Sequence, residues 1–207
     1  FMVSKLRVGI AGYGVVGQRR REFIDQNINL TTVAVSDKQF SRGVMEDGVR
    51  CYSDAVELFN ENLDVLFVSL PNNLSPIITM AGLNKGCHVF CEKPPGRNVK
   101  DIADVIDVEK RNPGLKLKYG FNHRYHDSVI AAKNLIESRE LGDLINLRGA
   151  YGKSKIVSFA SDWRTKREIS GGGILLDQGI HLLDMMRLFA GEFTDIYSFI
   201  SNSYWRH

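Results

Sequence analysis

The chain has 207 residues, of which 43% are hydrophobic and 25% charged, with 19 glycines and 5 prolines. These proportions are typical of a globular protein and exclude collagen, a coiled coil, a disordered tail and a disulfide-bonded scaffold. The net charge of +3 is small and dispersed, so we expect neither a nucleic-acid partner nor a membrane partner.

The three cysteines, Cys51, Cys87 and Cys91, have no metal-ligand spacing. We therefore expect buried thiols in a reducing compartment and no metal site. The apolar runs are short and the amino terminus has no signal-peptide pattern, so the cytoplasm is the expected location.

The first 120 residues alternate short apolar runs with helical patterns, which predicts an α/β fold with a doubly wound parallel sheet. The predicted strands are residues 6–11, 31–36, 49–52, 65–70, 88–91 and 115–121. The predicted helices are residues 15–25, 53–60, 76–84 and 99–110, with Ser53 as the N-cap of the second. Arg19, Arg20 and Arg21 are interpreted as a solvated face at the start of the first helix.

The pattern changes after Asn122, where we place a domain boundary. A helix over 128–139, a strand over 144–151, a polar loop over 152–173, an apolar helix over 174–189 and a strand over 196–204 are predicted there. Two strands supply little sheet, so either they extend another sheet or this part is incomplete at its C-terminus, and we expect the latter.

A glycine motif follows the first predicted strand and opens the first predicted helix. It reads Gly12, Tyr13, Gly14, Val15, Val16, Gly17, and Asp37 stands 20 residues beyond it, at the end of the second strand. This context predicts a dinucleotide-binding site, with the pyrophosphate at the helix N-terminus and the Asp37 carboxylate on the ribose hydroxyls. A carboxylate disfavours a 2′-phosphate, so NAD is the expected cofactor, with NADP left open by the nearby Lys38 and Arg42.

Further polar and proline residues follow the strands that end at the same sheet edge, namely Pro71, Asn72, Glu92, Lys93 and Asn122. Ligands of a doubly wound sheet bind at that edge. Lys93 is the candidate proton-transfer group, because burial or a nearby positive ring would lower the pKa of its amine. The alternative is a surface ion pair at a turn.

Asp177 and His181 are four residues apart on the apolar helix over 174–189, and Asp184 continues their stripe. A helix that is apolar nearly all round is expected to be buried, so the stripe should meet polar partners or a wet cavity. The alternative is a core histidine satisfied by Asp177 or Asp184. Gly171, Gly172 and Gly173 would let a ligand approach the backbone, or would act as a hinge.

Together these residues resemble the Gfo/Idh/MocA family of NAD(P)-dependent oxidoreductases. The resemblance rests on the segments GYGVVG, SLPN, CHVFCEKP, GFNHRY, DWR and GGGILLDQGIHLLD. It implies a Rossmann domain over residues 1–122 and a partial, sheet-rich α+β domain for substrate and oligomerisation over residues 123–207. Ser75 stands where the family usually has a histidine.

The resemblance also implies roles for single residues. Lys93, His181 and Asp177 would be catalytic, and Arg124, Asp177 and His181 would contact the substrate. The cofactor site would add to the glycine motif and Asp37 the residues Leu70, Pro71, Asn72, Glu92, Lys93, Asn122, Trp163 and Arg164.

The expected activity is hydride transfer between the nicotinamide and a secondary alcohol or ketone of a sugar, cyclitol or nucleotide sugar. The full-length protein is expected to be a dimer or tetramer. Two alternatives stay open: an enzyme that uses NAD transiently to cleave a glycosidic bond, and a non-catalytic regulator that senses the cofactor.

Overall fold

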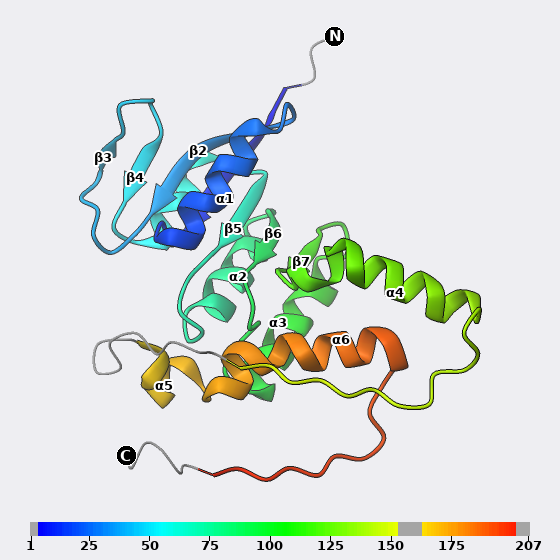
Figure 1. Cartoon of the computed structure of the whole chain (residues 1–207). Coiled ribbons are helices and arrows are strands. Elements are labelled where there is room, and N and C mark those ends of the chain that lie inside the picture. Colours follow the sequence, from blue (N-terminus) through cyan, green and yellow to red (C-terminus); the bar gives the residue numbers. More distant parts are fainter. Residues whose placement is uncertain (1–3, 153–162, 202–207) are drawn as a thin grey trace. The chain divides into compact units, whose positions relative to one another are not determined.

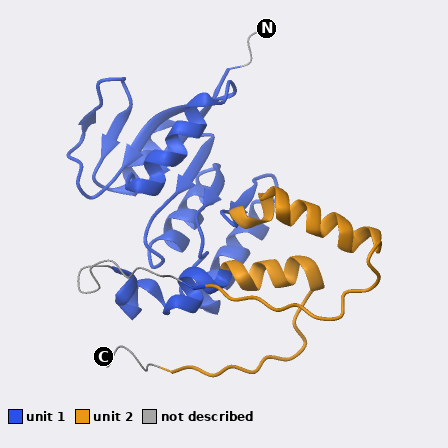
Figure 2. Ribbon diagram, viewed as in Figure 1, with its two compact units in different colours: residues 1–121, 152–180 blue, residues 122–151, 181–207 orange. Residues whose placement is uncertain are grey.

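The computed structural model describes residues 4–152 and 163–201 of the chain. The chain divides into two compact units (Figure 2). Unit 1 comprises residues 1–121 and 152–180, and unit 2 comprises residues 122–151 and 181–207. Each unit is described by itself.

Unit 1 contains one sheet, whose strand order in the described residues is β3-β4-β2-β1-β5-β6-β7 (Figure 1). Every neighbouring pair is parallel except β3 and β4. The strands are β1 Leu6–Ala11, β2 Leu30–Ser36, β3 Gly43–Val44, β4 Arg50–Tyr52, β5 Val65–Val68, β6 His88–Cys91 and β7 Leu117–Tyr119. Because the long strands are parallel, their carboxyl ends lie at one edge of the sheet, where ligands of such folds bind.

Helices connect most of these strands, and short helical segments make up the part of unit 1 after residue 162. They are α1 Val15–Gln26, the 3₁₀ helix η1 Ala55–Glu61, α2 Ser75–Asn84, α3 Val99–Arg111, the 3₁₀ turn η3 Trp163–Thr165, α5 Arg167–Ser170 and the π-helical turn η4 Leu175–Gly179. Pro76 stands in the first turn of α2, where its missing N–H costs no helical hydrogen bond. Asn98 caps α3 by accepting a hydrogen bond from the Asp101 N–H.

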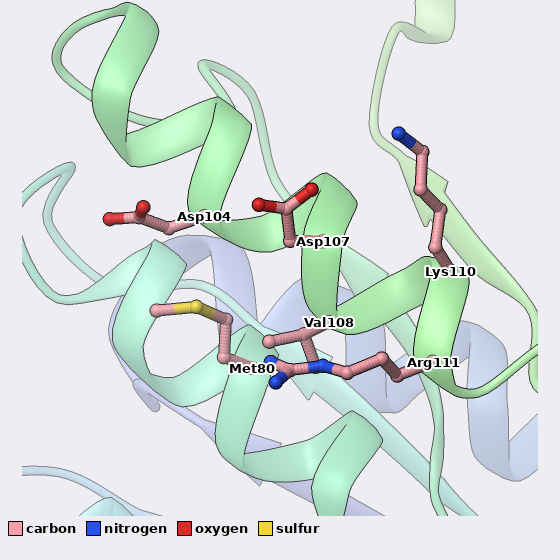
Figure 3. Close-up of a pocket in the computed structure, with 6 residues that line it drawn as sticks. All are labelled: Met80, Asp104, Asp107, Val108, Lys110 and Arg111. Atoms are coloured by element: carbon pink, nitrogen blue, oxygen red, sulfur yellow. The ribbon is translucent and has the colours of Figure 1, made fainter.

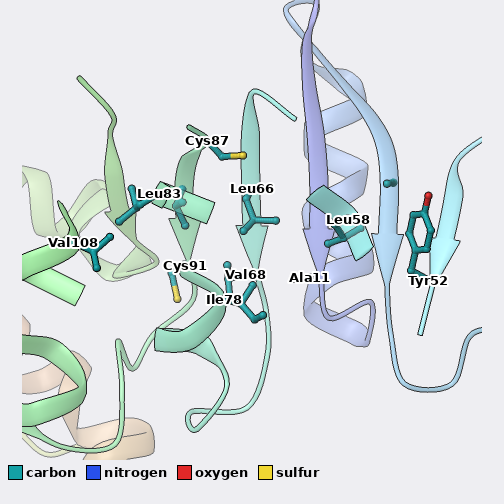
Figure 4. Packing of buried hydrophobic residues seen from close by; sticks show 12 residues of the cluster. Ala11, Tyr52, Leu58, Leu66, Val68, Ile78, Leu83, Cys87, Cys91 and Val108 are labelled. Carbon is teal, nitrogen blue, oxygen red and sulfur yellow. The ribbon is translucent and has the colours of Figure 1, made fainter. Parts of the chain in front are cut away.

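The core forms on both faces of the sheet, as expected for strands that are apolar on both sides. On one face Val8, Ile10 and Val35 pack with Ile24 of α1. The other face carries the larger cluster, with Leu66 and Val68 of β5 against Ile78 and Leu83 of α2 (Figure 4). α1 therefore covers one face, and α2, α3 and η1 cover the other.

The strands and helices predicted over residues 6–121 are confirmed to within a few residues at their ends. The polar loop predicted over 152–173 is wrong at 163–165 and 167–170, where η3 and α5 form and other parts of unit 1 bind the carbonyl oxygens of α5. One cap differs: Asp54, not Ser53, stands at the N-cap of η1, where its carboxylate accepts from the Val56 N–H. Both residues are of the types that cap helices, and the carboxylate one position closer satisfies the first turn. Cys87 and Cys91 are buried as predicted, whereas Cys51 is only partly buried.

Unit 2 contains the 3₁₀ turn η2 Asn122–Tyr125, helix α4 Asp127–Ser138 and nearly all of helix α6 Ile180–Ala190. The strands predicted over 144–151 and 196–204 are not formed at 144–151 or at 196–201, and residues 202–204 lie outside the described part. A strand needs a hydrogen-bonded neighbour, and the described residues of unit 2 supply none.

The burial of α6 also differs from the prediction of a helix buried all round. Its buried residues are His181 and Asp184, while Leu183 is 38% exposed. The polar stripe faces inward because ring and cation partners from η2 meet it, as described below. None of the described helices has both the length and the apolar character that crossing a membrane requires.

Candidate active site

The glycine motif connects β1 to α1, and its three glycines meet different surroundings. Gly12 has a φ of +87°, and a Cβ there would lie 2.4 Å from the Ser69 carbonyl oxygen. A Cβ on Gly17 would lie 2.0 Å from the Gly12 carbonyl oxygen, so the fold itself requires both glycines. A Cβ on Gly14 would have no atom within 4 Å, so the space in front of α1 is open at that position. This arrangement fits a pyrophosphate at the helix N-terminus.

Asp37 follows β2 and lies against this loop. Its carboxylate accepts hydrogen bonds from the backbone N–H of Tyr13, at 3.2 Å, and of Gln39, at 3.1 Å. The side chain is therefore fixed beside the glycine loop, at the position from which a carboxylate can bind ribose hydroxyls. Arg42 is one of the two cations near Asp37 that keep NADP as an alternative cofactor. Its guanidinium lies 5.8 Å from the centre of the Tyr52 ring.

The segment after β5 is held by its own polar groups. The Ser75 hydroxyl donates to the carbonyl oxygens of Leu70 and Pro71, at 3.0 and 3.2 Å. Asn72 is buried, and its Nδ2 donates to the Ser170 carbonyl oxygen at 2.8 Å. Asn72 thereby joins the β5 loop to the end of α5, within the same unit.

Lys93 follows β6 and reaches η4, which is 84 residues further along the chain. Its Nζ donates to the backbone carbonyl oxygen of Asp177 at 2.5 Å and lies 3.5 Å from the Asp177 Oδ1. The side chains of Lys93 and Asp177 are 17% and 23% exposed. This is a largely buried pair at the ligand-binding edge of the sheet, not the surface ion pair that the sequence left open.

The electrostatics of Lys93 follow from this placement. Burial lowers the pKa of Lys93, because the charged ammonium loses hydration, and the Asp177 carboxylate opposes part of that effect through its charge and its hydrogen bonding. The Arg164 cation acts in the same direction as burial, and Glu92 acts against it. A lysine whose neutral form is favoured in this way can exchange a proton with a bound hydroxyl group.

Arg164 completes this cluster in unit 1. Its Nε lies 3.7 Å from the Asp177 Oδ1, and its guanidinium lies 4.5 Å from the centre of the Trp163 ring. The Gln178 side chain donates to the other Asp177 oxygen at 3.0 Å. Asp177 is thus held by Lys93, Arg164 and Gln178 together.

Of the three glycines before η4, the first is required by the backbone around it. Gly171 has a φ of +81°, and a Cβ there would lie 2.4 Å from the Arg97 Cβ. The close approach of this backbone is to Arg97, whereas a Cβ on Gly173 would meet no atom within 4 Å. Arg97 also donates to the Glu168 carbonyl oxygen at 3.0 Å, which ties α5 to the loop before α3.

In unit 2, His181 belongs to a stack of three rings. Its imidazole lies parallel to that of His123, with centroids 4.1 Å apart, and Tyr151 stacks 5.7 Å from His123. His123 and Tyr151 were not among the predicted site residues. His123 lies between Asn122 and Arg124 in the same sequence motif, which is the one signal that could have identified it.

Arg124 and Asp184 form an ion pair within unit 2. Arg124 Nε and Nη2 donate to the two Asp184 oxygens at 2.8 and 2.5 Å, and Asp184 is buried. Asp184, one of the two partners proposed for a core histidine, is therefore bound to a guanidinium. Asn122 begins η2, directly before this pair and the ring stack.

Within unit 1 the structure brings together Lys93, Asp177 and Arg164, and separately the glycine motif and Asp37. Asn122, Arg124 and His181 belong to unit 2, so their approach to Lys93 stays a prediction. A hollow between α2 and α3, lined by Met80, Asp104, Asp107, Val108, Lys110 and Arg111, contains none of the predicted site residues (Figure 3).

Comparison with known proteins adds to this geometry. Residues 6–121 match the oxidoreductase family with an NAD-binding Rossmann fold, and residues 129–206 match the GFO/IDH/MocA C-terminal domain.

Two curated relatives are dehydrogenases. The chain is 30% identical to levoglucosan dehydrogenase of Pseudarthrobacter phenanthrenivorans over 68% of its own length and 36% of that protein. It is also 30% identical to D-glucoside 3-dehydrogenase of Escherichia coli, over 87% of its own length and 53% of that protein. The chain thus spans about half or less of these relatives.

Among solved structures, scyllo-inositol dehydrogenase from Lactobacillus casei with bound NAD(H) and scyllo-inositol aligns with a TM-score of 0.74 and 25% identity, over 91% of this chain and 57% of that one. The Rossmann family match alone covers more than half of the sequence. The chain therefore belongs to the Gfo/Idh/MocA family of oxidoreductases.

Proposed function

We propose that the protein is an NAD-dependent oxidoreductase that moves a hydride between the nicotinamide and a secondary alcohol carbon of a sugar or cyclitol. The observation that carries the proposal is the largely buried contact between Lys93 and Asp177. It lies after β6, at the same sheet edge as the glycine motif after β1. A dinucleotide site and a candidate proton-transfer group therefore belong to one edge of one unit.

The residues of unit 1 fit the cofactor. The open space at Gly14 and the start of α1 at Val15 would receive the pyrophosphate, and Asp37 would bind the ribose hydroxyls. The Asp37 carboxylate repels a 2′-phosphate, which favours NAD over NADP. When bound, NAD accepts the hydride from the alcohol carbon.

Lys93 handles the proton of the reacting hydroxyl group in this proposal. Burial lowers the pKa of its amine, so the neutral form that accepts a proton is more populated than for an exposed lysine. The Asp177 carbonyl oxygen fixes the Lys93 Nζ, and the Asp177 carboxylate would orient substrate hydroxyls. His181 is the second candidate proton acceptor, from its position in the family motif and its burial in unit 2.

The substrate class follows from the relatives. Their names give levoglucosan, D-glucosides and scyllo-inositol as substrates of those proteins. All three are ring polyols with secondary hydroxyl groups. A site with a carboxylate, a guanidinium and an amine is suited to bind several such hydroxyls at once.

The test is a substrate screen with the full-length protein. Inositols, glucosides and levoglucosan are each mixed with NAD or with NADP, and the absorbance of the reduced nicotinamide is followed. We expect net reduction of NAD with at least one ring polyol. Cleavage of a glycoside without net reduction of NAD, or no turnover of any ring polyol, would contradict the proposal.

A further inference from the structure

Arg20 of α1 forms an ion pair with Glu92, the residue directly before Lys93. Its Nη2 and Nε lie 2.5 and 2.6 Å from the Glu92 Oε1, although 72 residues separate the two in sequence. The side chains are 30% and 18% exposed. The expectation of a solvated face at Arg19 to Arg21 is therefore wrong for Arg20, which pairs with Glu92. It is also wrong for Arg21, whose side chain is 15% exposed and pairs with Asp25 and Asp47.

The Arg20 guanidinium is also fixed by a ring. It lies 4.8 Å from the centre of the Phe90 ring, and Phe90 stacks on Phe67 of the neighbouring strand. Side chains two positions apart in a strand share one face of the sheet. Phe90 and Glu92 thus both meet α1, and Arg20 contacts each of them.

Glu92 is confined on its other side by β7. A Cβ on Gly120 would lie 2.7 Å from the Glu92 Oε2, so the carboxylate occupies the space that a side chain at this position would fill. The carboxylate is therefore held between the Arg20 guanidinium and the backbone after β7.

The adjacent residues Glu92 and Lys93 therefore belong to two different ion pairs. Glu92 pairs with Arg20, and Lys93 pairs with Asp177. The charged groups that face Lys93 are Asp177, Arg164 and Glu92. The Arg20 guanidinium places a positive charge directly beside the Glu92 carboxylate. Without Arg20, the Glu92 charge would act on the neighbouring ammonium with no cation beside it.

We propose that Arg20 is a positioning residue: it holds the Glu92 carboxylate on the α1 side of the sheet, so that the Lys93 amine interacts with Asp177 and the substrate and not with Glu92. The inference rests on the proposed role of Lys93 in proton transfer. It adds a residue on α1 that acts on Lys93 through Glu92.

The test measures Lys93 directly and needs no substrate. In the full-length protein, the rate at which acetic anhydride acetylates Lys93 is followed against pH by peptide mass spectrometry, since only the neutral amine reacts. Arg20→Met should favour the charged ammonium and slow acetylation at mildly alkaline pH by about threefold to tenfold. Arg19→Met removes the same charge from an exposed neighbour on the same helix and should leave the rate unchanged.

Three further variants keep the test decisive. Arg20→Gln, which retains a donor toward Glu92 and is the gentler change, should slow acetylation as Arg20→Met does, whereas Arg20→Lys should stay within about twofold of the wild type. In a Glu92→Gln background, Arg20→Met should have little effect, because the charge through which it acts is gone. Equal rates for wild type, Arg20→Met and Arg20→Gln would overturn the inference, as would an undiminished effect without Glu92.

A second readout separates this inference from the proposed function. If a substrate is turned over, the acid limb of kcat/KM should move to higher pH in Arg20→Met and not in Arg19→Met. A protein with no turnover but with slowed Lys93 acetylation would contradict the proposed function and leave the role of Arg20 standing. Turnover of a substrate, together with unchanged Lys93 acetylation in Arg20→Met, would support the proposed function and contradict the role of Arg20.

Discussion

Lys93 has neighbours that oppose each other in their effect on its charge. Burial and the Arg164 cation favour the neutral amine, whereas Asp177 and Glu92 favour the ammonium. Burial is the largest of these effects, so the pKa of Lys93 is lowered from 10.5. The same shift that suits proton transfer also makes the stability of the fold depend on pH.

The expected pH dependence can be measured with Lys93→Met. Between the lowered pKa of folded Lys93 and its ordinary value of 10.5, the unfolded chain binds this proton more tightly than the folded chain does. The free energy of unfolding therefore rises with pH across that window, and the variant should lose this rise. Urea denaturation at several pH values between about 7 and 10 checks it.

The exposed Lys85 offers the control, because Lys85→Met should follow the wild type at every pH. A stability difference between wild type and Lys93→Met that stays constant across the window would show that the pKa of Lys93 is not lowered by folding.

At the scale of elements, the loop between β1 and α1 separates two uses of glycine. Gly12 and Gly17 are required by the backbone around them, whereas Gly14 has open space where a Cβ would lie. Because the free protein has room for a side chain at Gly14, we infer that the glycine is required when the cofactor is bound, where it allows the pyrophosphate to approach the backbone closely.

Gly14→Ala and Gly12→Ala should therefore fail in different ways. Gly14→Ala should change the free energy of unfolding by less than about 0.5 kcal/mol and weaken NAD binding by about tenfold or more. Gly12→Ala should lose roughly 2 kcal/mol or more, because its Cβ meets the Ser69 carbonyl and its φ is +87°. Thermal unfolding and calorimetric titration with NAD measure the two effects. Unweakened NAD binding by Gly14→Ala would place the pyrophosphate elsewhere.

The segment from η3 to η4 brings Asp177 to Lys93, and Gly171 sets its path. The Asn72 and Arg97 side chains hold the carbonyl oxygens of Ser170 and Glu168, so the backbone at Gly171 lies against Arg97. No larger residue fits between them.

Gly171→Ala should destabilise the protein by about 2 kcal/mol, since it combines a positive φ with a Cβ contact of 2.4 Å. Gly173→Ala is the matched control, two residues away with open space, and should stay within about 0.5 kcal/mol of the wild type. Chemical denaturation compares the two. Equal stability of the two variants would contradict the described path of this segment.

The elements of unit 1 could be predicted because their apolar periods and punctuating residues agree with the final sheet. The prediction of strands is wrong at 144–151 and 196–201, because alternation of apolar and polar residues shows only that a strand could pair, not that a neighbouring strand is present. The sequence predicted that the stripe of His181 and Asp184 would meet polar partners, and both side chains are buried. Their partners, His123 and Arg124 of η2, could not be predicted, because they lie about 60 residues away in sequence.

At the scale of the whole molecule, the predicted site residues divide between the two units. Residue type and strand order sufficed to predict that the glycine motif, Asp37 and Lys93 follow parallel strands of unit 1. The pairing of Arg20 with Glu92 could not be predicted, because a contact across 72 residues depends on how α1 crosses β6. His181, the second candidate proton acceptor, belongs to unit 2, and the alignments with two dehydrogenase relatives cover 36% and 53% of those proteins.

One comparison tests the central claim most directly: turnover and NAD binding of Lys93→Ala against the wild type and Lys85→Ala, in the full-length protein with a ring polyol that it oxidises. The account predicts that all three bind NAD within about threefold of one another. Lys93→Ala alone should lose kcat by about 100-fold or more, since it removes the proton-transfer group. Wild-type kcat in Lys93→Ala would contradict the account, because the proton would then move through a group other than Lys93.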